Sequence, residues 1–179
     1  MVSHARTDLQ PLNKANLVPS AKTEGYKLSG EYHITTDLIR FDRLYDEIMN
    51  SGSSYRTYMN CVQIFDMYDT DIQLDVRDDT VRYLTEEYRT KYFSVLEKLL
   101  EILQESGDYE GIRKVAEKGM LIEPDKPEMY YWLIAAYDKM NMPHTAREYL
   151  RTAQNRLSKG EYQQLTKLLD VKQIYVDVR

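Results

Sequence analysis

The sequence is poor in cysteine, proline and glycine and contains no long hydrophobic run. Its 179 residues include one cysteine, five prolines and seven glycines. A single cysteine excludes an internal disulfide, and so few turn-forming residues disfavour a many-stranded β-sandwich. Met1 is followed neither by an apolar signal core nor by a run of about 18 apolar residues that could span a bilayer. We therefore expect a soluble, cytoplasmic protein with no membrane association.

Acidic residues outnumber basic ones. The chain has 29 Asp and Glu against 24 Lys and Arg, which gives a formal net charge of −5. Because phosphate contacts need clustered Lys and Arg, this balance argues against direct DNA binding by this chain alone. With 42% hydrophobic and 30% charged residues, the composition is that of a folded helical protein and not of a disordered tail.

Hydrophobic periodicity divides the chain into four segments. Residues 1–24 show no lasting period and are expected to form a tail or linker. Apolar and polar residues alternate through residues 25–35 on either side of a Ser-Gly pair, which predicts a short β-hairpin. Residues 36–170 have a helical period, and residues 171–179 are expected to be a C-terminal tail. The expected fold class is therefore all-α with a short N-terminal hairpin.

The helical segment begins with a predicted pair of helices that Ser51 and Gly52 interrupt. On the second helix of that pair, Cys61 is expected to be a buried structural thiol. The apolar spacing predicts that its buried face consists of Tyr55, Tyr58, Val62 and Phe65. An acidic connector over residues 66–79 is expected to be solvated. The expected helical ranges are 37–66 for the pair, then 79–105, 109–121, 126–140, 143–156 and 159–169.

The helical segment repeats itself along the chain. The aligned positions are Leu96 with Tyr130, Leu99 with Leu133, Leu103 with Tyr137, Val115 with Tyr149, and Gly119 with Ala153. The repeat period is about 34 residues, and paired helices with this period are the signature of tetratricopeptide repeats. The pattern therefore predicts antiparallel helix pairs stacked in a right-handed superhelix.

Turn and capping residues support the same repeat. Gly107 can take the left-handed conformation at the turn of the first copy, and Asn141 tolerates it at the equivalent position of the second. A small residue at Gly119 allows two helices to approach closely. Ser158 and Glu161 have the spacing of a capping box, which predicts one more helix at the C-terminal end of the repeats.

Four motifs occur in order along the chain. They are Thr36-Asp37 with Phe41, the stretch Tyr68-Asp69-Thr70-Asp71-Ile72, the pair Glu87 and Tyr92, and the stretch from Gly107-Asp108-Tyr109 to Ile122-Glu123-Pro124. In this order, residues 31–157 resemble the bacterial transcriptional activator domain of antibiotic-regulatory-type (SARP) transcription factors. The resemblance implies a regulatory domain that binds protein and catalyses nothing.

The resemblance also gives a meaning to the predicted hairpin. In such regulators a winged-helix DNA-binding domain ends in a strand with the pattern Gly-Tyr-X-Leu, and Gly25-Tyr26-Lys27-Leu28 stands at that place. A basic recognition helix does not precede it. The chain is therefore expected to be either the effector half of a longer regulator or a stand-alone relative. The expected partners are the DNA-binding half of the same regulator, the transcription machinery, or a second copy of the chain.

In tetratricopeptide folds the first helix of each repeat builds the concave groove. By that resemblance the groove residues are Ser94, Glu97, Glu101, Gln104, Glu128, Tyr131, Ala135 and Asp138. Four of these eight are acidic and none is basic. We expect the groove to take a basic or neutral protein segment with Tyr131 as an aromatic anchor, or else the acids to be a solvated face. The alternative function is a tetratricopeptide adaptor outside transcription that captures a peptide in this groove.

No residue pattern indicates catalysis, a metal or a cofactor. His4, His33 and His144 are far apart and have no partner at ligand spacing. The aspartates from Asp66 to Asp79 lack the central glycine and terminal glutamate of a calcium loop. The glycines around residue 107 lack the lysine of a phosphate-binding loop. We therefore predict a protein that is not an enzyme and needs no cofactor.

Overall fold

The computed structural model describes residues 20–21, 25–26, 36–52, 55–69 and 79–171. Most of these residues are helical, so the predicted all-α class is confirmed. The chain divides into two compact units, 1–40 and 41–179, which are described separately. The elements are β1 (Ser20–Ala21), β2 (Gly25–Tyr26), α2 (Asp37–Met49), α3 (Tyr55–Met67), α4 (Asp79–Ser106), α5 (Tyr109–Ile122), α6 (Pro127–Lys139), α7 (Pro143–Arg156) and α8 (Lys159–Val171).

In the first unit, β1 and β2 pair antiparallel. Ser20 lies opposite Tyr26, and Ala21 lies opposite Gly25. The pairing therefore begins inside the segment expected to be a tail. Of the hairpin predicted for residues 25–35, residues 25–26 form β2, and the remainder lies outside the described residues.

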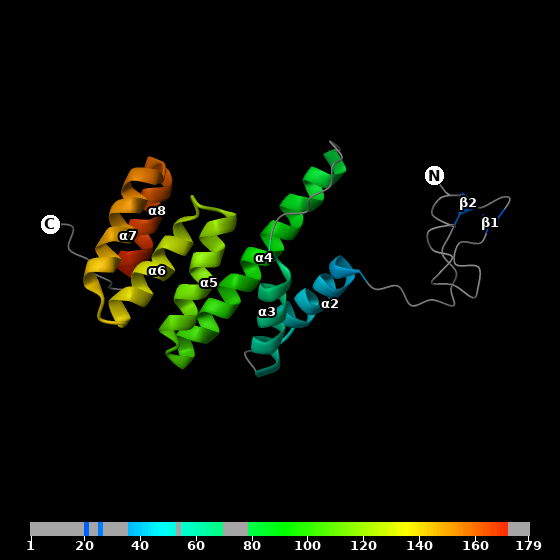
Figure 1. Cartoon of the computed structure of the whole chain (residues 1–179), viewed down its shortest axis with the longest axis horizontal. Helices are drawn as coiled ribbons and strands as arrows, with labels where there is room; N and C mark the ends of the chain where they lie inside the picture. The colour runs from blue at the N-terminus through cyan, green and yellow to red at the C-terminus, as the bar shows by residue number, and fades with distance from the viewer. Residues whose placement is uncertain (1–19, 22–24, 27–35, 53–54, 70–78, 172–179) are drawn as a thin grey trace. The chain divides into compact units, whose positions relative to one another are not determined.

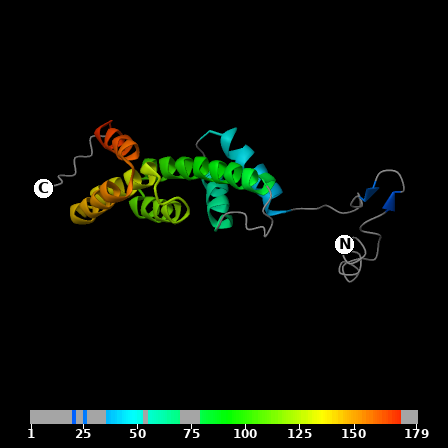
Figure 2. The same ribbon diagram turned by 90° about the horizontal axis from the view of Figure 1, so that it is seen from above.

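In the second unit, each helix from α3 to α6 lies beside the next helix in the chain. Helix α3 packs against α4, α4 against α5, α5 against α6, and α6 against both α7 and α8. Figure 1 shows α4 to α7 in this order, and Figure 2 shows the length of α4 from above. The buried residues form one hydrophobic cluster that runs from α2 to α8. The helix ends from α4 onward differ from the expected ones by at most two residues.

The repeat period of the sequence is present in the backbone. Helices α5 and α7 are equal in length, and each end of α7 stands one repeat period after the corresponding end of α5. The aligned apolar positions are buried in both copies, apart from Tyr149, which is partly buried. The sequence repeat is therefore a repeat of one helix pair.

The turns inside the two pairs have the same geometry. Gly107 has a φ of 73° and Asn141 a φ of 60°, so both residues are left-handed. The next N–H in each copy reaches back to close the helix: Asp108 N donates to the Leu103 carbonyl at 2.9 Å, and Met142 N to that of Tyr137 at 2.8 Å. This is the Schellman arrangement of a helix C-terminus. The predicted left-handed turns are confirmed.

Helix α8 starts with the predicted capping box. The Ser158 N–H donates to the Glu161 carboxylate at 2.7 Å, and the Glu161 N–H donates to Ser158 Oγ at 3.4 Å. These bonds satisfy backbone donors that the first turn leaves without helical partners.

The buried face predicted for α3 is wrong. Tyr55 is 79% exposed, and the other three residues of that face are only partly buried. The buried residues are instead Thr57, Asn60, Cys61 and Ile64. Two of them are polar and find partners before α3 in the chain: the Thr57 hydroxyl donates to the Gly52 carbonyl at 2.7 Å, and the Asn60 amide donates to Glu47 at 3.0 Å. These bonds let the polar side chains enter the interior.

Helix α5 is held closely between α4 and α6 at Gly119. A Cβ built on Gly119 would meet Sδ of Met129 on α6. It would also lie 3.1 Å from Cγ of Met129 and 3.3 Å from Cδ1 of Leu96 on α4. The close crossing expected at this glycine is therefore present.

Replacing Gly119 by leucine should destabilise the protein by about 1–3 kcal/mol, because the side chain overpacks the crossing. Urea denaturation followed by circular dichroism measures the change. The matched control is Gly160→Leu on α8, where a Cβ would meet nothing within 4 Å. We expect that variant to be as stable as the parent or slightly more so, since glycine is a poor helix former. A Gly119→Leu variant as stable as Gly160→Leu would contradict this packing.

Candidate functional site

Residues that carry the family resemblance meet in the second unit. Phe41 on α2 lies edge-on to Tyr88 on α4, with ring centroids 5.3 Å apart. Tyr68, which follows α3, stacks on Tyr92 with centroids 4.2 Å apart, and it lies 6.4 Å from Phe41. These four buried rings, named the aromatic cluster, join α2 and the end of α3 to α4. The motif residues Phe41, Tyr68 and Tyr92 therefore belong to the core.

A cation lies beside the aromatic cluster. Lys91 Nζ is 2.9 Å from Asp42 Oδ1 and 2.8 Å from Glu87 Oε1. It also lies over two rings, 4.8 Å from the centroid of Tyr88 and 5.8 Å from that of Tyr45. Two tyrosines, an aspartate and a glutamate thus surround one ammonium group. We name this arrangement the Lys91 cage.

The charges in the Lys91 cage support one another. Burial works to raise the pKa of Asp42, but hydrogen bonds from Tyr88 and Lys91 and the charge of Lys91 hold it below its ordinary value. Burial and the hydrogen bond to Asp42 raise the pKa of Tyr88 to about 12. Burial works to lower the pKa of Lys91, yet the bonds to Glu87 and Asp42 raise it. At neutral pH Asp42 therefore carries its negative charge and Lys91 its positive charge, whereas Tyr88 is neutral.

The predicted groove residues on α4 lie on an open surface. Glu97, Glu101 and Gln104 are exposed. Ser94 is partly buried, and its hydroxyl donates to the Thr90 carbonyl at 3.1 Å. This half of the predicted groove is accessible to a partner.

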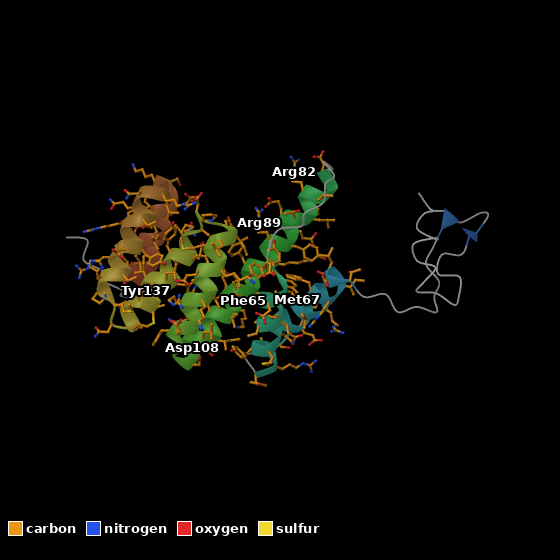
Figure 3. All side chains as sticks on the ribbon, in the orientation of Figure 1. Phe65, Met67, Arg82, Arg89, Asp108 and Tyr137 are labelled. Carbon is orange, nitrogen blue, oxygen red and sulfur yellow. The ribbon has the colours of Figure 1, made fainter. Side chains whose placement is uncertain are left out.

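The predicted groove residues on α6 are covered to different extents. Glu128 and Asp138 are partly buried, whereas Tyr131 is 4% exposed and Ala135 is 8% exposed. Figure 3 labels Tyr137, which also belongs to the core and stacks on a tyrosine of α7. Tyr131 is therefore a core residue, and the anchor role expected for it does not fit its burial.

Helix α8 explains the burial of Tyr131. Helix α6 packs against α5, α7 and α8, and nine of its 13 residues are buried. Gln164 on α8 donates to Glu128 Oε1 at 2.5 Å, so α8 meets α6 on the side that carries the groove residues. Leu165 and Leu169, the buried residues of α8, stand one repeat period after Tyr131 and Ala135. The last helix thus covers the second half of the predicted groove.

Carboxylates of α4 and α6 influence one another. Partial burial raises the pKa of Glu97, the charges of Glu128 and Glu101 raise it further, and Lys126 opposes them. Glu101 itself lies 3.4 Å from Lys98 Nζ. Glu97 therefore lies within electrostatic reach of both Glu101 and Glu128, and we name these three residues the acidic face.

A separate pocket opens between the first turn of α3 and the last turn of α4. It has a volume of about 500 Å³ and is lined by Tyr55, Tyr58, Ile102, Leu103, Glu105, Ser106 and Asp108. Figure 3 labels Asp108 at the turn from α4 to α5. Sequence reasoning missed this pocket because it assigned both tyrosines to the buried face of α3. We name it the Tyr55 pocket.

The described residues present no metal site and no membrane span. Among them, no group of three His, Cys, Asp or Glu is placed to hold a metal ion. Cys61 is fully buried, and burial raises the pKa of its thiol to about 11, so it is a poor nucleophile. No helix in the described ranges is long and apolar enough to cross a bilayer.

Comparisons with protein-family models, with curated proteins and with solved structures find no match to this chain. Its function is therefore inferred from the arrangement of its own residues. On the described part of the chain, the acidic face and the Tyr55 pocket are surfaces that a partner can reach.

Replacing Tyr131 by phenylalanine should leave stability unchanged or raise it by up to about 1 kcal/mol. Its hydroxyl is buried and has no hydrogen-bond partner among the described residues, so the change removes a polar group that they leave unsatisfied. The matched variant is Tyr88→Phe, which loses the 2.7 Å bond from its hydroxyl to Asp42 and should cost about 1 kcal/mol. Urea denaturation compares the two. A larger loss for Tyr131→Phe than for Tyr88→Phe would be inconsistent with this burial.

Proposed function

We propose that this chain is a regulatory protein-interaction domain of a transcriptional regulator, similar to the bacterial transcriptional activator domain of SARP factors. One observation carries the proposal. Phe41, Tyr68 and Tyr92 carry the resemblance from three separate motifs, and they pack together in the aromatic cluster. Sequences that share a fold are expected to share the residues that pack together in its core.

The repeat supports a second part of the proposal. We propose that the helix pairs form a right-handed superhelix of the tetratricopeptide kind, preceded by the short hairpin of residues 25–35. Gly107 and Asn141, one repeat period apart, give the two copies the same left-handed turn. Stacked helix pairs of this period present extended surfaces to protein partners. The domain then acts by binding and has no catalytic role.

The proposed binding surface is the exposed half of the predicted groove. Because α8 covers Tyr131, contact centres on Glu97, Glu101 and Gln104 of α4. The negative charges of the two glutamates suit a basic or neutral segment of another protein. The expected partners are the DNA-binding half of the regulator, the transcription machinery or a second copy of the chain. An adaptor outside transcription would use the same face, so a transcriptional readout is needed to distinguish the two.

The first test is charge reversal of Glu97 and Glu101 to lysine in a reporter assay. The chain is fused to an unrelated DNA-binding protein whose operator lies upstream of a bacterial reporter. We expect the fusion to raise transcription several-fold above the DNA-binding protein alone, and the double variant to lose this increase. Each exposed charge should change stability by only about 0.5 kcal/mol or less.

The control for this test is Glu148→Lys with Asp170→Lys, which changes the net charge equally at exposed positions on α7 and α8. That variant should keep full reporter activity. No activation by the parent fusion would contradict a role in transcription and favour the adaptor. Full activity of the folded Glu97 and Glu101 variant would show that another surface binds the partner.

The second test concerns DNA. With a formal net charge of −5, the isolated chain should bind labelled duplexes no more tightly than about 1 μM at physiological salt, and without sequence preference. Fluorescence anisotropy with several duplexes measures this. Submicromolar affinity that depends on the sequence would contradict the proposal that this chain acts only through protein contacts.

A further inference from the structure

We propose that the Tyr55 pocket binds a basic side chain, arginine in preference to lysine, from a segment of a partner protein. The inference deepens the proposed function and rests on it for the kind of partner. It concerns a pocket between α3 and α4 that none of the three residues of the acidic face lines.

The open side of the pocket is aromatic. Tyr55 and Tyr58 are one helical turn apart, with ring centroids separated by 6.5 Å and ring planes inclined by 37°. Tyr55 is 79% exposed, which makes its ring available to a ligand. The face of such a ring carries negative potential and attracts a cation within about 6 Å.

Two of the residues that line the pocket are acidic. Glu105 is exposed and makes no ion pair with any residue that the structure describes. Asp108 uses one carboxylate oxygen to accept the Gly111 N–H at 2.9 Å, which caps α5. The described lining contains no basic side chain. Arg56, which follows Tyr55 in the chain, is already paired with Glu47 at 3.1 Å.

The floor of the pocket is apolar. It is formed by Ile102, which is partly buried, and by Leu103, which is buried. Long basic side chains pack their methylene groups on such a surface and keep the charged end among polar groups. With about 500 Å³, the pocket has room for one basic side chain and part of its backbone.

The chain already uses this set of groups to hold a cation. In the Lys91 cage, two tyrosines, one aspartate and one glutamate surround the ammonium group of Lys91. The Tyr55 pocket has two tyrosines, one aspartate and one glutamate, and no cation among the residues that line it. The Tyr55 pocket therefore has the same four acidic and aromatic side chains as the Lys91 cage, which already holds a cation.

The position of the pocket favours a protein segment over a small cation. Glu97, Glu101 and Glu105 are spaced four residues apart on α4, so they form a stripe along one side of the helix that ends at the pocket. The stripe is about 12 Å long at the helical rise of 1.5 Å per residue, close to the span of four extended residues. A segment on the acidic face would therefore reach the pocket.

Arginine suits the pocket better than lysine. Its planar guanidinium stacks on a tyrosine ring and at the same time donates to a carboxylate, whereas an ammonium group is a compact point charge. The open ring of Tyr55 and the carboxylate of Glu105 offer both contacts. We therefore expect a measurable preference for arginine.

The experiment is an NMR titration of the full chain, labelled with nitrogen-15, with the peptide acetyl-Ala-Arg-Ala-amide. Peptides with lysine or glutamine in place of arginine are the comparisons. We expect the arginine peptide to shift the amide signals of Tyr55, Tyr58, Glu105 and Asp108 with a dissociation constant near 1 mM. The lysine peptide should bind about twofold more weakly, and the glutamine peptide should cause no saturable shifts.

Variants assign the binding to the pocket. Tyr55→Ala should weaken it about two- to fivefold, as expected for a lost contact between a cation and an exposed ring. Glu105→Gln should weaken it and reduce its dependence on salt. The matched control is Tyr83→Ala on α4, because Tyr83 is 69% exposed and lies outside the pocket. That variant should bind as the parent does, and thermal melting checks that all three variants are folded.

Three results would overturn the inference: equal binding of the glutamine peptide, unchanged binding by Tyr55→Ala, or shifts confined to Glu97 and Glu101. None of them would contradict the proposed function, which the reporter assay tests through other residues. Conversely, a silent reporter fusion together with peptide binding at the pocket would overturn the transcriptional role and leave the pocket as a site for basic segments.

Discussion

The packing of α4 with helices on both sides of it in the chain is the constraint on which the rest of the second unit depends. Toward its N-terminal end, Tyr88 and Tyr92 contact Phe41 and Tyr68, which holds α2 and the end of α3. Further along, Leu96 lies against the close crossing at Gly119 on α5. One 28-residue helix thus belongs to two packing units. The exposed acidic residues of α4 therefore hold fixed positions relative to both packing units.

The parts of this fold that the sequence predicts well are those governed by local chemistry. The turn at Gly107 needs only a residue that tolerates a positive φ, and the capping box at Ser158 needs only two residues three positions apart. Both signals lie within a few residues of the structure that they determine. Repetition strengthens them, because Asn141 takes the same conformation one repeat period later.

The parts that the sequence does not predict depend on residues that are distant in the chain. Helical spacing favours a buried Tyr55, but Asn60 and Thr57 enter the interior because Glu47 and Gly52 satisfy their polar groups. The spacing of α3 carries no information about those partners. The Tyr55 pocket could not be predicted for the same reason, since it exists only because that tyrosine faces outward. Of the candidate site, the exposed acids of α4 followed from the repeat, whereas the burial of Tyr131 followed from the docking of α8.

The packing of α8 also predicts which helices of the repeat region unfold locally first and which unfold last. Helix α6 is surrounded by three helices, so its amide hydrogens should exchange with solvent only on nearly global unfolding. Helix α8 packs mainly on α6 and should therefore open first. Local opening of α8 would uncover Tyr131 and Ala135 while α4, α5 and α6 stay folded. The second half of the groove is therefore closed by a helix that packs mainly on one neighbour.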